Sequence, residues 1–123
     1  MTTAILCRAD RSHLAALEAI EQASFTTDRI SRRSFRRFID QKIGDFQVAM
    51  VDGQVVGYFI VLYRQATQLA RLYSLAVAPQ WRRQGIGSQL LEAAEDAADE
   101  RHCLFLRLEV KTDNEGAKAM YHQ

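Results

Sequence analysis

Two glycines separated by one residue, Gly85 and Gly87, follow a pair of arginines and a glutamine at residues 82–84. Glycine has no Cβ, so the backbone N–H groups beside it can approach an anion closely. The residues after Gly87 have helical spacing, and the start of a helix adds free N–H donors and the positive end of the helix dipole. The range Pro79–Ser88 is therefore predicted to bind a phosphate or a pyrophosphate.

Two familiar phosphate-binding patterns do not match this turn. A dinucleotide site of the Rossmann type needs a third glycine and an acidic residue after the next strand. A P-loop needs a lysine followed by serine or threonine after its glycines. This turn has neither the third glycine nor the Lys-Ser/Thr pair, which argues against nucleotide hydrolysis.

The elements on either side of the glycine turn set its position. Leu69–Val77 has β-forming residues and predicts a strand, and residues 89–100 have apolar positions at helical spacing with no glycine or proline. Cys103–Val110 is densely apolar and predicts a buried strand that runs parallel to the first. A strand–helix–strand unit of this size is right-handed by default.

The rest of the chain predicts helices and an antiparallel hairpin. Asp52-Gly53 between two β-rich runs is typical of a hairpin turn, and Asp10 and Ser31 are expected helix N-caps. The other expected elements are a strand at Thr3–Arg8, helices from Asp10 to about Ala23 and from Ser31 to Gly44, strands at Phe46–Val51 and Val55–Tyr63, and a last helix at Asp113–Tyr121. This order predicts one α/β domain over residues 1–123, with a mixed central sheet flanked by helices.

The composition agrees with one ordinary globular domain. The chain has 123 residues, of which 48% are hydrophobic and 25% are charged. A net charge of +1 does not by itself indicate a nucleic-acid partner. Cys7 and Cys103 have no metal-binding spacing, so we expect buried thiols and no metal site. No signal peptide or membrane-spanning run is visible, and we expect a cytoplasmic protein.

The glycine turn and three neighbouring blocks resemble a known family. Arg82-Arg83-Gln84-Gly85-Ile86-Gly87 is similar to the Gln/Arg-x-x-Gly-x-Gly/Ala signature of the GNAT superfamily of N-acetyltransferases. The blocks Leu75–Pro79, Leu108–Val110 and Asn114–Tyr121 match at fitting distances, so the resemblance covers almost the whole chain. Within this superfamily, the sequence most resembles bacterial ribosomal-protein N-terminal alanine acetyltransferases. The resemblance implies a GNAT fold and acetyl-CoA as co-substrate.

The resemblance also implies which residues would bind acetyl-CoA. The backbone amides of the glycine turn would hold the pyrophosphate; the matching positions are Arg82, Arg83, Gln84, Gly85, Ile86, Gly87 and Ser88. The strand Leu75-Ala76-Val77 would pair with the pantetheine arm, and its amides would polarise the thioester carbonyl. Asn114 matches a residue that contacts the same arm.

Two further residues match the acid and the base of the family. Tyr121 matches the general acid, and a phenol with a pKa of about 10 can protonate a departing thiolate. Glu109 matches the glutamate that is the base in the ribosomal-protein enzymes, where a carboxylate can take the proton of the amine. Alternatively, Glu109 is a surface carboxylate at a strand end and Tyr121 is a packing residue.

The sequence leaves several candidates for the acceptor of the acetyl group. The resemblance implies acetyl transfer to a primary amine, first of all a protein N-terminus such as that of a ribosomal protein. Lysine side chains and small amines are the next candidates. The alternative from another class is a non-catalytic acyl-CoA-binding or regulatory module. Neither membrane nor direct nucleic-acid binding is expected.

Five arginines gather at residues 29–37, namely Arg29, Arg32, Arg33, Arg36 and Arg37. Four of them share roughly one face of the predicted helix. The sequence favours an ordinary solvated face, and the functional alternative is an acidic substrate or an RNA-rich surface such as the ribosome.

The sequence departs from the family pattern after Tyr121. Relatives usually continue with Gly-Phe and two more strands, whereas only His122 and Gln123 follow here. Those strands normally lie beside Leu104–Val110, so the edge of this strand is expected to be open or covered by a second copy in a homodimer.

Overall fold

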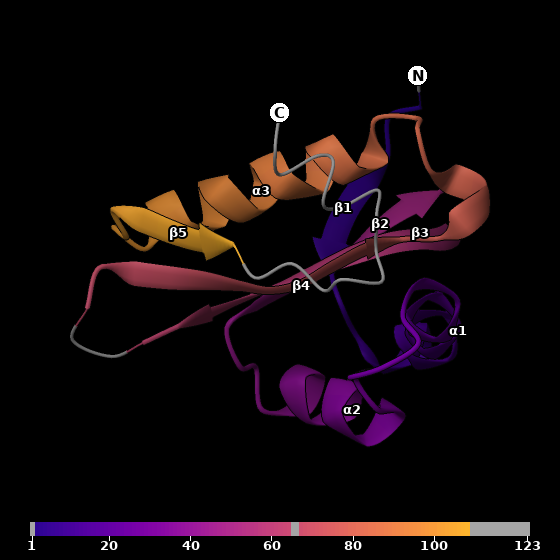
Figure 1. The fold of residues 1–123 in the computed structure, drawn as a ribbon, viewed down its shortest axis with the longest axis horizontal. Coiled ribbons are helices and arrows are strands. Elements are labelled where there is room, and N and C mark those ends of the chain that lie inside the picture. Colours follow the sequence, from indigo (N-terminus) through magenta and orange to yellow (C-terminus); the bar gives the residue numbers. More distant parts are fainter. Residues whose placement is uncertain (1, 65–66, 109–123) are drawn as a thin grey trace.

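One five-stranded sheet forms the centre of the molecule in the computed structural model, which describes residues 2–64 and 67–108 (Figure 1). The strands lie in the order β1-β2-β3-β4-β5; the first three pairings are antiparallel and β4 pairs with β5 in parallel. The elements are β1 (Ile5–Arg8), α1 (Leu14–Ser24), α2 (Arg32–Asp40), β2 (Asp45–Val51), β3 (Gln54–Tyr63), β4 (Leu69–Val77), α3 (Ile86–Glu100) and β5 (Phe105–Leu108). This arrangement confirms the predicted mixed sheet with a parallel pair around the helix.

Helices cover both faces of the sheet. α1 and α2 lie on one face and α3 lies on the other, as Figure 1 shows. Leu17, Phe35 and Tyr58 are fully buried under the first pair of helices, and Leu72 and Leu90 are fully buried under α3. The sheet therefore separates two apolar cores, and each core fixes the position of one helical layer.

The predicted helix caps and the hairpin turn are present. Ser31 accepts a hydrogen bond from the Ser34 amide at 3.1 Å and begins α2. Asp10 is also an N-cap, but it begins a 3-10 turn that becomes α-helical only at Leu14. Asp52 and Gly53 both have positive φ, 51° and 76°, as a two-residue hairpin turn of type I′ requires.

β4 contains one extra residue relative to β3. Ile60 pairs with Ser74 and Val61 pairs with Leu72, so Tyr73 is a β-bulge. The bulge places Tyr73 and Ser74 on the same face of the sheet, because Tyr73 packs on Phe38 of α2 and Ser74 bonds to Tyr58. The sequence did not predict this bulge.

The prediction of buried thiols is wrong for Cys7, which is exposed. It lies on β1, an edge strand that pairs only with β2 among the described residues and is largely exposed. Cys103 is half-buried, and both cysteines are free. None of the helices within residues 2–64 and 67–108 is long and apolar enough to cross a membrane.

Candidate active site

The second half of β4 has an open backbone edge within the described part of the chain. β4 and β5 pair from Leu69 with Phe105 to Leu72 with Leu108. On its other side β4 remains paired with β3 as far as Val77 with Gly57. Tyr73–Val77 therefore have no partner on the β5 side among residues 2–64 and 67–108.

The amides of Leu75 and Val77 face this open edge. The amide of Ala78 donates to the carbonyl oxygen of Val56 on β3 at 2.8 Å. Because N–H groups alternate between the two sides of a strand, the amides of Leu75 and Val77 point away from β3. The side chains of residues 75–77 are buried, so this edge offers only its backbone to a ligand.

The glycine turn leads directly from the end of β4 into α3. Gly85 has the left-handed conformation (φ 86°, ψ 0°) that glycine adopts without strain, and α3 begins at Ile86 with no side-chain cap. The first helical bond runs from the Gln89 amide to the Gly85 oxygen at 3.1 Å. The preceding amides, those of Ile86, Gly87 and Ser88, are the donors that a helix start leaves for an anion.

The N-terminal residues hold the glycine turn in place. The Thr2 amide donates to the Gln84 carbonyl at 3.1 Å, and the Thr2 hydroxyl donates to the Gln84 side-chain oxygen at 2.6 Å. Gln89 bonds to both backbone groups of Ala4, accepting at 3.0 Å and donating at 2.6 Å. Sequence reasoning missed these contacts. It predicted only a first strand at Thr3–Arg8, and in the structure that strand begins at Ile5.

The two predicted arginines of the turn have different surroundings. Arg82 donates from Nε to the Val77 carbonyl at 3.0 Å and from Nη2 to the Ser24 hydroxyl at 3.2 Å. It thus joins the end of β4 to the last residue of α1, and these contacts orient the turn. Arg83 is exposed and has a positive φ of 62°. A role of either side chain in binding the pyrophosphate stays a prediction.

A buried polar network lies behind the bulge of β4. The Tyr58 hydroxyl donates to one carboxylate oxygen of Glu21 and lies 2.7 Å from the Ser74 hydroxyl oxygen. The other carboxylate oxygen of Glu21 accepts from the Ile30 amide at 2.7 Å. All three side chains are at most 2% exposed, and burial raises the pKa of Tyr58 well above its usual value. The network connects α1, the loop before α2 and the strand at the candidate site.

Three predicted site residues, Glu109, Asn114 and Tyr121, lie outside the described residues. Their assignments as base, pantetheine contact and acid stay predictions. Within residues 2–64 and 67–108, no group of three His, Cys, Asp or Glu side chains could hold a metal ion.

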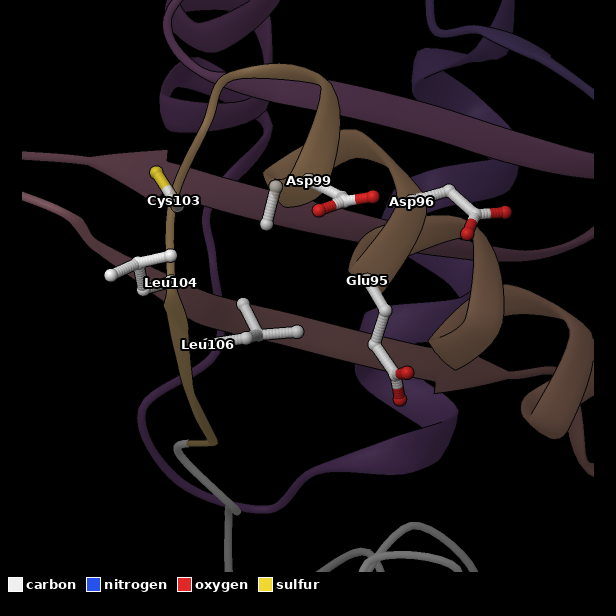
Figure 2. A pocket seen from close by; sticks show the side chains of 7 residues that line it. Glu95, Asp96, Asp99, Cys103, Leu104 and Leu106 are labelled. Atoms are coloured by element: carbon white, nitrogen blue, oxygen red, sulfur yellow. The ribbon is translucent and has the colours of Figure 1, made fainter.

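A hollow lies between the C-terminal half of α3 and β5 (Figure 2). Its volume is about 420 Å³, and three carboxylates from α3, those of Glu95, Asp96 and Asp99, lie beside Leu104 and Leu106. Glu95 is nine residues into α3, so it lies roughly 14 Å from the helix start. These carboxylates would repel a pyrophosphate, and the glycine turn is the better anion site.

Comparisons with known proteins agree with this geometry. A model of the acetyltransferase (GNAT) family matches residues 14–123. A ribosomal protein bS18-alanine N-acetyltransferase from Escherichia coli is 32% identical over 93 residues, which are 74% of this chain. The chain spans only 60% of the length of that relative.

Solved structures share the fold. Ard1 from Thermoplasma volcanium has a TM-score of 0.81 and 28% identity, with 98% of this chain and 80% of that chain covered. A PaiA N-acetyltransferase from Thermoplasma acidophilum, solved in complex with coenzyme A, has a TM-score of 0.82 over 98% of this chain and 87% of that chain. At 18% identity this second likeness concerns the fold alone. Because the family model matches nearly the entire chain, the chain belongs to the GNAT acetyltransferase family.

Proposed function

We propose that this protein transfers an acetyl group from acetyl-CoA to a primary amine, and that the preferred acceptor is a protein N-terminus. One observation carries the proposal: the open edge of β4 ends at Val77, and eight residues later Gly85 leads into the uncapped start of α3. Donors for a pyrophosphate and donors for a pantetheine arm are thereby adjacent. This is the arrangement that a coenzyme A thioester needs.

The described residues would bind and orient the thioester. The amides of Ile86, Gly87 and Ser88 would hold the pyrophosphate, assisted by the helix dipole. The amides of Leu75 and Val77 would pair with the pantetheine arm and donate to the thioester carbonyl. Such donors stabilise the negative charge that develops on the carbonyl oxygen during attack.

The transfer itself forms one bond and breaks one. The neutral amine attacks the carbonyl carbon, the N–C bond forms, and the C–S bond breaks to release the coenzyme A thiolate. The amine gives its proton to a base, for which Glu109 is our candidate, and the thiolate receives a proton from Tyr121. These two roles rest on the family resemblance.

The relatives support the choice of co-substrate and acceptor. The matching family model describes acetyltransferases, and the Escherichia coli relative is named for the alanine of ribosomal protein bS18. Both findings are consistent with an acetyl-CoA-dependent enzyme that modifies a protein N-terminus. We propose the reducing cytoplasm as its location. Self-association through the 104–110 strand remains part of the proposal, and light scattering would measure it.

A thiol-release assay with acetyl-CoA and peptides of varied N-termini tests the proposal. We expect release of coenzyme A that depends on the amine. Binding of acetyl-CoA without amine-dependent release would instead favour a non-catalytic acyl-CoA-binding module. Release with lysine side chains or polyamines but no N-terminus would reassign the acceptor.

A pair of glycine variants tests the location of the cofactor. Gly85→Glu should abolish acetyl-CoA binding, because it adds a carboxylate where the pyrophosphate is expected and a side chain at φ 86°. Gly53→Glu is the matched control, since Gly53 has a φ of 76° and has open space around it in the hairpin turn. Equal affinities of the two variants for acetyl-CoA would show that the site lies elsewhere.

A further inference from the structure

α2 carries four exposed arginines on the side opposite its buried face. Phe35 and Phe38 point into the core, and the outward positions are Arg32, Arg33, Arg36 and Arg37. α2 contains a single acidic residue, Asp40. Its outer face is therefore strongly positive on a protein whose total net charge is only +1.

Part of this charge distribution opposes the helix. The first turn contains no acidic residue, and cations near a helix N-terminus oppose the dipole. Arg33 and Arg37 are four residues apart, a spacing at which like charges repel. Only Arg37, which lies in the last turn, and Arg36, which pairs with Asp40, favour the helix.

Asp40 lies close to only one of the four arginines of α2. It bonds to Arg11 at 2.8 Å and lies 3.6 Å from Arg36. Within the described residues, Arg32, Arg33 and Arg37 form no ion pair with an acidic side chain. Arg33 and Arg37 lie one turn apart on the same side of α2, and we call them the arginine pair.

Two ring contacts connect Arg37 of the arginine pair with the candidate site. The guanidinium of Arg37 is 5.6 Å from the centre of the Phe38 ring, and that ring is 5.7 Å from the ring of Tyr73. Tyr73 is the bulge residue at the start of the open edge of β4. An acceptor whose amine reaches this edge can therefore extend along α2 toward the arginine pair.

We propose that the arginine pair selects acceptor peptides with acidic residues shortly after the reactive amine. This inference rests on the proposed function, because it assigns the substrate class of the same site. A peptide suits the site better than RNA does, since the free positive charge is confined to one nine-residue helix roughly 13 Å long. RNA affinity usually needs a longer basic surface.

Peptides that share their first two residues and carry aspartates, lysines or serines at the next three positions test the inference. At low salt, kcat/KM and affinity from fluorescence anisotropy should both be roughly fivefold higher for the acidic than for the serine peptide. The preference should shrink in high salt, because exposed charges are screened. The lysine peptide should be the poorest of the three.

Variants assign the effect to the arginine pair. Arg33→Gln with Arg37→Gln should remove most of the preference, whereas Arg36→Gln should reduce it much less, because Arg36 lies 3.6 Å from the Asp40 carboxylate. Circular dichroism confirms that each variant is folded. Equal binding of acidic and lysine peptides, or a preference that survives the double variant, would overturn the inference.

The two proposals can fail separately. Absence of thiol release with every peptide contradicts the proposed acetyl transfer, whereas the binding measurement still decides the charge preference. Release without any charge preference contradicts the inference and leaves the acetyl transfer intact. Binding of RNA oligonucleotides through the arginine pair, without a peptide preference, would also overturn it.

Discussion

Tyr58→Phe is a sharp test of the polar network behind the candidate site. The substitution removes one oxygen atom from a fully buried side chain. The ring contacts to Phe35 and Phe46, with centroid separations of 5.5 and 5.9 Å, would remain. Any loss of stability would therefore come from the hydrogen bonds of the hydroxyl group.

The expected magnitude follows from the partners of that hydroxyl. One partner is a buried Glu21 carboxylate oxygen, and a hydrogen bond to a charged group contributes about 1.5–3 kcal/mol. The other partner is Ser74, for which about 1 kcal/mol is typical. We expect the free energy of unfolding to fall by about 2–4 kcal/mol.

Urea denaturation followed by circular dichroism measures this loss, and Tyr63→Phe is the matched control. The Tyr63 hydroxyl also donates to a carboxylate, that of Asp45, but this contact is only part-buried and should contribute less. If Tyr58→Phe were no more destabilising than Tyr63→Phe, the network would not stabilise the fold as we infer.

Two further perturbations test separate parts of the structure. The hydrogen bond from Arg11 lowers the pKa of Asp40, so the stability from this pair is complete above the ordinary carboxyl pKa and is lost as pH falls through the lower folded value. Asp40→Asn should therefore lower the melting temperature at pH 7 and leave it less dependent on pH below 4; unchanged acid sensitivity would count against the pair. Gly57→Ala should reduce stability by about 1–3 kcal/mol in urea denaturation, because its Cβ would lie 2.9 Å from the Ala76 oxygen and 3.0 Å from Leu90 Cδ1. A wild-type urea midpoint would show that β3 and α3 can separate at little cost.

Local sequence patterns predicted the turns and helix ends whose conformation is determined by adjacent residues. Asp52-Gly53 defines its own turn, and Ser31 caps the helix that follows it. Gly85 introduces α3 in the same way. The hairpin of β2 with β3 and the parallel pairing of β4 with β5 were predicted from such elements, whereas the pairing of β1 with β2 was not.

Contacts between distant residues were not predictable in this way. Glu21 looks like a surface residue of an amphipathic helix until Tyr58, 37 positions later, is placed beside it. The β-bulge at Tyr73 depends on the register with β3, which no local pattern sets. The bond from Arg82 to the Ser24 hydroxyl joins residues 58 positions apart, and no local pattern indicates it.

Two-dimensional amide NMR during titration with coenzyme A tests the central claim most directly. We predict that the largest shifts occur at the amides of Ile86, Gly87 and Ser88, together with those of Leu75 and Val77. The amides of Glu95–Asp99, beside the acidic hollow, should change little. Shifts concentrated at the acidic hollow, with an unchanged glycine turn, would contradict the account.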